Sequence, residues 1–194
     1  MYLEDIITSE VRIKIIIELF SETDKHLYVR ELTRRVGTEI NAVRRELKRL
    51  TKAGLIKKER RGNRLYYLIK KDHPFYYEMM AIVSKEKGIG KRILENWSEL
   101  GKVKLAMLSS DFAEGRESEK DELDLLLVGN VNLDLLSKLV SENGEEFKRD
   151  INYTVLGEEE FEYLKGRRDP FLLSFLIAPN IIIGGDTAKY LSFV

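Results

Sequence analysis

The sequence contains no cysteine, and its only two histidines are His26 and His73. Without cysteine the chain cannot form a disulfide, use a thiol nucleophile or bind zinc and heavy-metal ions through thiolates. The two histidines lie far apart in the sequence, and we expect each at the surface rather than in a metal cluster. No bound metal is therefore expected.

Long hydrophobic runs are missing as well. The longest apolar run, FLLSFLIAP at 171–179, is far shorter than the roughly 20 residues that a membrane-spanning helix needs. The first residues, MYLEDIITSEVR, do not form the basic and then apolar pattern of a secretory signal. Since 43% of the residues are hydrophobic and 34% are charged, the chain can form a buried core. We expect a soluble, cytoplasmic protein with no membrane partner.

The net charge of zero conceals an uneven distribution. Residues 1–72 include 18 basic and 11 acidic residues, a net charge of +7, whereas the remainder has 15 basic and 22 acidic residues, a net charge of −7. Such asymmetry is typical of a basic module for nucleic acid joined to a different module. We therefore expect a two-domain α+β protein with a DNA-binding domain at 1–72, a helical linker at 73–101 that could support dimerisation, and a second domain at 102–194.

Helices are predicted in the basic half at 9–20, 28–37 and 38–54, because apolar residues recur there at spacings of three and four. Ser9 is a possible cap of the first helix, and Gly37 is expected to end the second in the left-handed conformation. The third helix is expected to begin at the cap Thr38, to end at Gly54 and to bury Ile40, Val43, Leu47 and Leu50. Its outer face carries Asn41, Arg44, Arg45, Lys48, Arg49 and Lys52.

A basic hairpin is predicted after the third helix. The sequence LIKKERRGNRLYYLIK at 55–70 predicts two strands joined at Arg61–Gly62–Asn63, because Gly and Asn tolerate the positive φ of a tight turn. The exposed polar residues at its tip would be Arg60, Arg61, Asn63 and Arg64. Residues 44–71 include twelve basic residues against Glu46 and Glu59, which suits the neutralisation of phosphates. The alternative is that these basic residues form only a solvated charged surface without a nucleic-acid partner, as is common in heat-stable proteins.

This order of helices and hairpin resembles the ArsR-type winged-helix regulators over residues 9–71, most specifically in RLTKAGLIKKERRGNRLYYL. The resemblance implies a winged helix-turn-helix domain whose third helix lies in the major groove of double-stranded DNA. Because such DNA-binding proteins are commonly two-fold symmetric, a homodimer that regulates transcription is expected.

The acidic half alternates predicted strands and helices, which indicates a small α/β domain. Strands are expected at 103–110, 123–129 and 151–157, with a helix at 132–144. The aromatic and methionine residues of the preceding linker are expected to pack in a core or between subunits rather than to bind a ligand.

The segments SDFAEG at 110–115 and ELD at 122–124 resemble the motif of the nucleotidyltransferase superfamily. In that motif ten residues separate the Gly-Ser pair of Gly-Ser-Phe-Ala-Arg-Gly from an Asp-Ile-Asp strand, and ten residues, 112–121, likewise separate Asp111 from Glu122. The flanking segments look like the small domains of this superfamily that are fused to winged helices, which implies a nucleotidyltransferase-like fold with a mixed sheet. In such domains two carboxylates on one face of a strand hold Mg²⁺ and the nucleotide phosphates. Glu122 and Asp124 stand at those positions.

The phosphate side departs from the motif. Ser110 and Asp111 stand at the Gly and Ser positions, and Glu114 stands at the Arg position. Asn152 stands where a third carboxylate is expected, with Asp150 as the only nearby substitute. A carboxylate about 4 Å from a phosphate costs on the order of 4 kcal/mol at an effective dielectric of about 20. We therefore predict a degenerate nucleotide site with no catalytic residue, formed by Ser110, Asp111, Glu114, Glu122, Asp124 and Asn152.

Three functions are compatible with these patterns. The first is a DNA-binding transcriptional regulator that is not an enzyme and has no cofactor, with the second domain as a scaffold, dimerisation element or ligand sensor. The second is an active nucleotidyltransferase that uses Mg²⁺ at Glu122 and Asp124, with the winged helix for targeting or self-regulation. The third, by resemblance alone, is an interaction module of a toxin–antitoxin pair. The sequence does not identify an effector.

Overall fold

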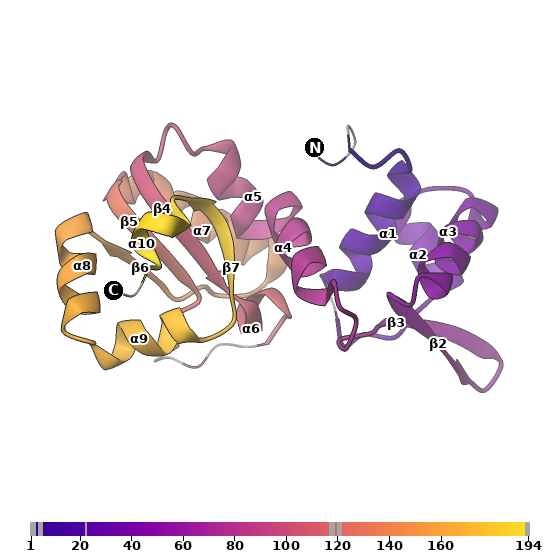
Figure 1. Cartoon of the computed structure of the whole chain (residues 1–194). Coiled ribbons are helices and arrows are strands. Elements are labelled where there is room, and N and C mark those ends of the chain that lie inside the picture. The colour runs from indigo at the N-terminus through magenta and orange to yellow at the C-terminus, as the bar shows by residue number, and fades with distance from the viewer. Residues whose placement is uncertain (1–2, 4–5, 22, 117–118, 120–121, 193–194) are drawn as a thin grey trace. The chain divides into compact units, whose positions relative to one another are not determined.

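The computed structural model describes residues 3, 6–21, 23–116, 119 and 122–192. The chain is a two-domain α+β protein that divides into Met1–Glu86, the N-terminal unit, and Lys87–Val194, the C-terminal unit (Figure 1). The segment expected to be a linker is shared between them, because helix α4 (Tyr76–Glu86) lies in the first unit and α5 (Gly88–Glu95) in the second. In the described part of the chain, no helix combines the length and the apolar character needed to cross a membrane.

The N-terminal unit packs its helices with a small antiparallel sheet in which β3 lies between β1 and β2. Helix α1 contacts α2, α3 and α4, and therefore lies at the centre of the unit. Besides α4, the elements are α1 (Glu10–Phe20), β1 (Leu27–Tyr28), α2 (Val29–Val36), α3 (Ile40–Lys52), β2 (Ile56–Arg61) and β3 (Arg64–Ile69).

Local sequence explains most of the helix ends. Ser9 caps α1, since its side chain accepts a hydrogen bond from the backbone N–H three residues on. Gly37 ends α2 with a left-handed φ of 67°, and Gly54 follows α3 with a φ of 80°. The prediction of a Thr38 cap is wrong, because the residue that precedes α3 is Glu39, and it makes no capping hydrogen bond through its side chain.

The C-terminal unit contains a mixed sheet with the strand order β6-β5-β4-β7. Strand β4 is antiparallel to both β5 and β7, whereas β5 and β6 are parallel and α7 connects them. Besides α5, the elements are β4 (Gly101–Ser109), α6 (Ser110–Ala113), β5 (Leu125–Val131), α7 (Leu133–Phe147), β6 (Tyr153–Leu156), α8 (Glu158–Gly166), α9 (Pro170–Ile177), β7 (Asn180–Gly185) and α10 (Thr187–Tyr190).

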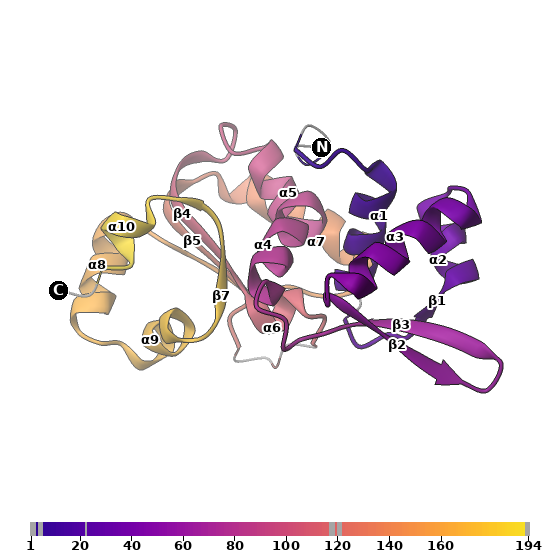
Figure 2. The same cartoon turned by 45° about the vertical axis from the view of Figure 1, so that its right-hand side comes forward.

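Both faces of this sheet are covered by helices (Figure 2). On one face, Met107 and Val128 pack with Phe161 of α8, Leu172 of α9 and Tyr190 of α10. Helix α5, which contacts α7 and β7, lies with α7 on the other face (Figures 1 and 2). Strand β4 ends, and β5 and β7 begin, at the same end of the sheet. The segments that form the predicted nucleotide motif lie at this end.

Candidate nucleic-acid interface and ligand pocket

The outer face of α3 is exposed and basic. The opposite face is apolar and turned inward, where Val43 and Leu47 are fully buried. Every residue of α3 that was predicted to contact DNA is exposed, and the structure places on this one helix Asn41, Arg44, Arg45, Lys48, Arg49 and Lys52.

The acidic residue of α3, Glu46, is withdrawn from this outer face. Only 6% of its surface is exposed. Its carboxylate accepts hydrogen bonds from Arg12 Nε of α1 at 2.7 Å and from Arg49 Nη1 at 2.8 Å. Burial raises the pKa of the Glu46 carboxyl, but the hydrogen bond and charge of Arg12, together with the charge of Arg49, outweigh burial and hold the pKa below 4.5. Glu46 therefore binds α3 to α1 as an anion.

Two of the arginines near the tip of the β2–β3 hairpin contact other side chains of the same unit. Arg61 Nε donates to Glu59 Oε1 at 2.8 Å, and the Arg61 guanidinium contacts the ring of His26. The guanidinium carbon of Arg64 lies 5.1 Å from the ring centroid of Tyr28, in β1. The predicted residues of the tip are nevertheless all exposed, namely Arg60, Arg61, Asn63 and Arg64.

In the C-terminal unit, the two acidic residues that differ from the nucleotidyltransferase motif, Asp111 and Glu114, both form ion pairs with Arg116. Arg116 Nη1 lies 2.7 Å from Asp111 Oδ1, and Arg116 Nη2 lies 3.6 Å from Glu114 Oε2. Glu114 is 8% exposed, whereas Asp111 lies at the surface. The expectation that both carboxylates face an incoming phosphate is therefore corrected, since one is buried and Arg116 partly neutralises both.

The carboxylates of the ELD segment also differ in their surroundings. Glu122 and Asp124 both precede the first residue of β5, so the strand alternation expected for them does not apply. Glu122 is exposed, whereas Asp124 is 2% exposed and its Oδ2 accepts a hydrogen bond from Asn152 N at 2.8 Å. Asn152 Nδ2 in turn donates to Glu119 O at 2.8 Å. Asn152 thus supports the loop rather than facing open solvent.

In the turn from β4 into α6, most of the backbone N–H groups are already paired within the protein. A phosphate site needs backbone N–H groups that are free to bind the anion. Here Ser109 N donates to Asp124 O at 2.7 Å and Ser110 N donates to Pro179 O at 3.1 Å. Phe112 N is directed to Ser109 Oγ at 3.4 Å. Moreover, the described residues include no group of three or more carboxylates and histidines that could hold a metal ion.

A hollow of about 230 Å³ nevertheless lies at this end of the sheet, and we call it the α9 pocket. Parts of the chain that are distant in sequence meet in its wall: the end of β4 with α6, the loop before β5, helix α9 and the first residue of β7. Its polar and aromatic lining includes Ser109, Asp111, Arg116, Glu122, Asp124, Phe171, Ser174, Phe175 and Asn180. Sequence reasoning missed the α9 and β7 contributions, because it treated FLLSFLIAP only as an apolar run.

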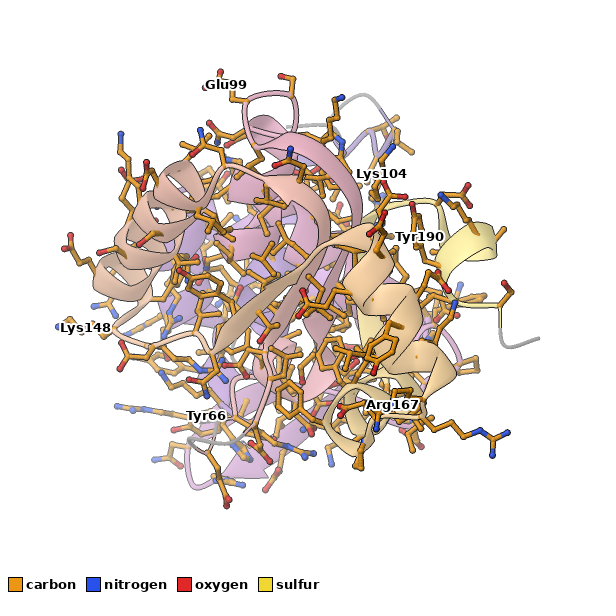
Figure 3. All side chains as sticks on the ribbon, turned by 90° about the vertical axis from the view of Figure 1, so that its left-hand side faces the viewer. Tyr66, Glu99, Lys104, Lys148, Arg167 and Tyr190 are labelled. Carbon is orange, nitrogen blue, oxygen red and sulfur yellow. The ribbon has the colours of Figure 1, made fainter. Side chains whose placement is uncertain are left out.

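A second polar cluster ties α10 to α8 and β4, on the side of the C-terminal unit where Figure 3 labels Lys104 and Tyr190. Tyr190 Oη donates to Glu158 Oε2 at 2.5 Å and accepts from Lys189 Nζ at 2.9 Å, while Lys104 Nζ lies 3.8 Å from Glu158. The hydrogen bonds from Tyr190 and Lys189 lower the pKa of Glu158. Glu158 thus pairs with two lysines and a tyrosine hydroxyl, and these contacts hold α8, α10 and β4 together.

Comparison with known proteins does not assign the chain to a family. No protein-family model matches the sequence, and a search of curated proteins finds no match. Among solved structures, the fold is similar to part of human N-acetylserotonin methyltransferase in complex with SAM, at a TM-score of 0.30 and 13% sequence identity. The match covers 61% of this chain and 36% of the methyltransferase chain.

This match bears on the prediction that the chain is not an enzyme. The matched structure is that of an enzyme, so the prediction is corrected and no longer stands. At a TM-score of 0.30 the similarity carries no argument for methyl transfer, or for any other reaction, by this chain.

Proposed function

We propose that the N-terminal unit is a winged-helix DNA-binding domain and that the chain regulates transcription. In this proposal α2 and α3 form the helix-turn-helix, α3 enters the major groove, and the β2–β3 hairpin is the wing that lies along the phosphate backbone. The C-terminal unit then acts as a scaffold or as a sensor. The observation that carries the proposal is the basic outer face of α3.

The charge distribution on α3 favours DNA over a merely solvated surface. A solvated helix gains from acidic and basic side chains interspersed on its outside. In α3 the acidic residue Glu46 is instead buried and paired with Arg12, so the exposed face carries cations with little opposing charge. Such a face releases counterions when it neutralises phosphates.

The position of each side chain along α3 suggests its role. Helices of this kind contact base edges mainly through their first turns. Asn41, Arg44 and Arg45 lie nearest the start of α3, and asparagine and arginine make bidentate contacts to adenine and guanine respectively. Lys48 and Lys52 lie farther along the helix, where contacts to phosphates fix the position of the protein.

Two-fold symmetric operators are the usual targets of helix-turn-helix regulators, since each half-site takes one recognition helix. We therefore propose that the protein binds DNA as a homodimer. Half-sites would then be separated by about 34–36 Å, or one helical turn of DNA.

Selection from a random library of duplex DNA with the full chain tests this function. The selected duplexes should share a motif, and their affinity measured by fluorescence anisotropy should fall with salt. If about six phosphates are neutralised, log K against log salt should have a slope near −5, at about 0.9 per phosphate.

A matched pair of charge reversals locates the interface. Lys48→Glu in α3 should abolish selection, whereas Lys138→Glu in α7, also an exposed lysine, should leave it intact. Binding that is insensitive to salt, or equal loss in both variants, would contradict the proposed interface.

A further inference from the structure

The α9 pocket presents hydrogen-bond acceptors. Asn180 Nδ2 donates to Phe175 O at 2.5 Å, which leaves Oδ1 as the free polar atom of this amide. Oδ1 is buried and has no hydrogen-bond partner in the described part of the chain. The carboxylates of Asp111 and Glu122 line the same pocket, and carboxylates are acceptors when ionised.

Several donors in the wall are directed to protein atoms. Ser174 Oγ donates to Phe171 O at 2.7 Å, and Arg116 Nη1 is bound to Asp111 Oδ1 at 2.7 Å. The backbone N–H groups of Ser109 and Ser110 donate to carbonyl oxygens across the sheet edge. The carboxylates and the unpartnered amide oxygen therefore favour a ligand that brings hydrogen-bond donors of its own.

Aromatic and apolar side chains form the rest of the wall. Phe171 on α9 is 49% exposed at the pocket, while Phe175 and Leu123 are buried beneath it. The face of an aromatic ring attracts a cation, and its area attracts an apolar group. The lining of the pocket therefore combines hydrogen-bond acceptors with aromatic rings.

The charged residues that line the pocket are mainly acidic. Asp111, Glu122 and Asp124 are acidic, and Arg116 is the basic residue among the described lining residues. A negative field favours a cationic ligand and opposes a phosphate or carboxylate. A bare metal ion does not suit the aromatic wall, and the described residues hold no cluster of three metal-ligating side chains.

From the acceptors, the aromatic wall and the charge, we infer that the α9 pocket binds a small organic ammonium ion, namely an amine that carries N–H donors and an apolar group. The ammonium lies between the carboxylates of Asp111 and Glu122, beside Asn180, and the apolar group lies against Phe171. The inference does not rest on the proposed DNA binding, because the pocket and the basic face of α3 belong to different units.

The first test uses 2-phenylethylammonium as the probe, titrated into the full chain and followed by calorimetry and ligand-observed NMR. Two matched compounds define what is recognised: 3-phenylpropionate has the ring with the opposite charge, and trimethyl(2-phenylethyl)ammonium has the charge without N–H donors. We expect the probe to bind at least tenfold more tightly than either compound. Equal binding of the propionate would overturn the inference.

Variants of the chain give effects of opposite sign. Asp111→Asn combined with Glu122→Gln should weaken probe binding at least tenfold, because both substitutions keep the shape and remove the charge. Arg116→Gln should strengthen it several-fold, because it releases Asp111 from its ion pair. If the double variant does not fold, the expected increase in probe affinity of Arg116→Gln still tests the inference. Unchanged probe affinity in Arg116→Gln would refute the assignment.

Titration with Mg-ATP separates the ammonium site from a nucleotide site. We expect no binding of Mg-ATP and no competition with the probe. Binding of Mg-ATP in place of the probe would overturn the inference and favour the nucleotidyltransferase reading of the motif. DNA binding is measured separately through the α3 variants, so failure of one proposal is distinguishable from failure of the other.

Discussion

Arg12 Nε on α1 lies 2.7 Å from Glu46 Oε2 on α3, and the two residues bind the basic helix to the centre of the N-terminal unit. Arg49 adds a second contact to the same carboxylate, so Glu46 also restrains one of the exposed cations of α3. A single buried anion therefore connects the stability of this unit to the arrangement of its basic face.

Glu46→Gln should lower the free energy of unfolding of the N-terminal unit by about 1 to 2 kcal/mol. A hydrogen bond to a charged group contributes about 1.5–3 kcal/mol, and solvent near Arg12 reduces this. Urea unfolding followed by circular dichroism measures the loss. Trp97 is the only tryptophan and lies in the C-terminal unit, so its fluorescence transition should not shift. Glu39→Gln, at an exposed position, is the control, and an equal effect there would argue against the pairing.

The same pair predicts a pH dependence of stability. The pKa of Glu46 is lowered in the folded chain, so its contribution is fully present above the ordinary value of 4.5 and is lost as pH falls through the folded value. The difference in unfolding free energy between the natural chain and Glu46→Gln should be constant from pH 6 to 8, at about 1 to 2 kcal/mol, and should shrink below about pH 4.5. If the difference in unfolding free energy instead grows as pH falls, the pKa of Glu46 is raised rather than lowered in the folded chain.

Arg45→Ala and Lys48→Ala should weaken DNA binding in different ways. Arg45 is placed to read a base, so its loss should cost about 1–3 kcal/mol on the preferred duplex and relax the preference at one position. Lys48 is placed to contact a phosphate, so its loss should weaken all duplexes similarly and reduce the salt slope by about 0.9. Anisotropy titrations on the selected and a scrambled duplex at several salt concentrations distinguish the two. Identical behaviour of the variants would contradict these roles.

Tyr28→Leu should weaken DNA binding through Arg64. The Tyr28 ring lies under the Arg64 guanidinium, and an exposed contact of this kind is worth about 0.5–1 kcal/mol. We expect a two- to fivefold loss of affinity that disappears in the background of Arg64→Ala. A double-mutant cycle measures the coupling, and additive losses would show that Tyr28 does not act through Arg64.

The elements of the N-terminal unit follow directly from local patterns. The three- and four-residue spacing of Val43, Leu47 and Leu50 predicted the buried face of α3, and Gly62 at the turn predicted the hairpin. These signals lie within a few residues of one another in the sequence. Prediction from sequence therefore succeeded for these local elements, but not for the start of α3, where the Thr38 cap is wrong and Ile40 is only partly buried.

The electrostatic contacts could not be predicted in the same way. Arg12 and Glu46 belong to different helices, and nothing in the sequence indicates that one carboxylate of α3 is buried while its neighbours are exposed. Asp124 was expected to extend from a strand, but β5 begins one residue later and the carboxylate turns inward toward Asn152. Burial and pairing of charges depend on tertiary packing, which periodicity does not encode.

The pairing of Ser109 with Asn180 has a consequence for how the C-terminal unit forms. Strand β7 follows β4, β5 and β6 in the sequence. The edge of β4 that pairs with β7 therefore stays unpaired until this distant segment reaches it. Contacts between such distant segments are the slow ones in folding, because a long loop has to close before they are made. Since Ser109 and Asn180 both line the α9 pocket, the pocket exists only once this closure is complete, and any molecule held there selects the fully assembled sheet over its folding intermediates.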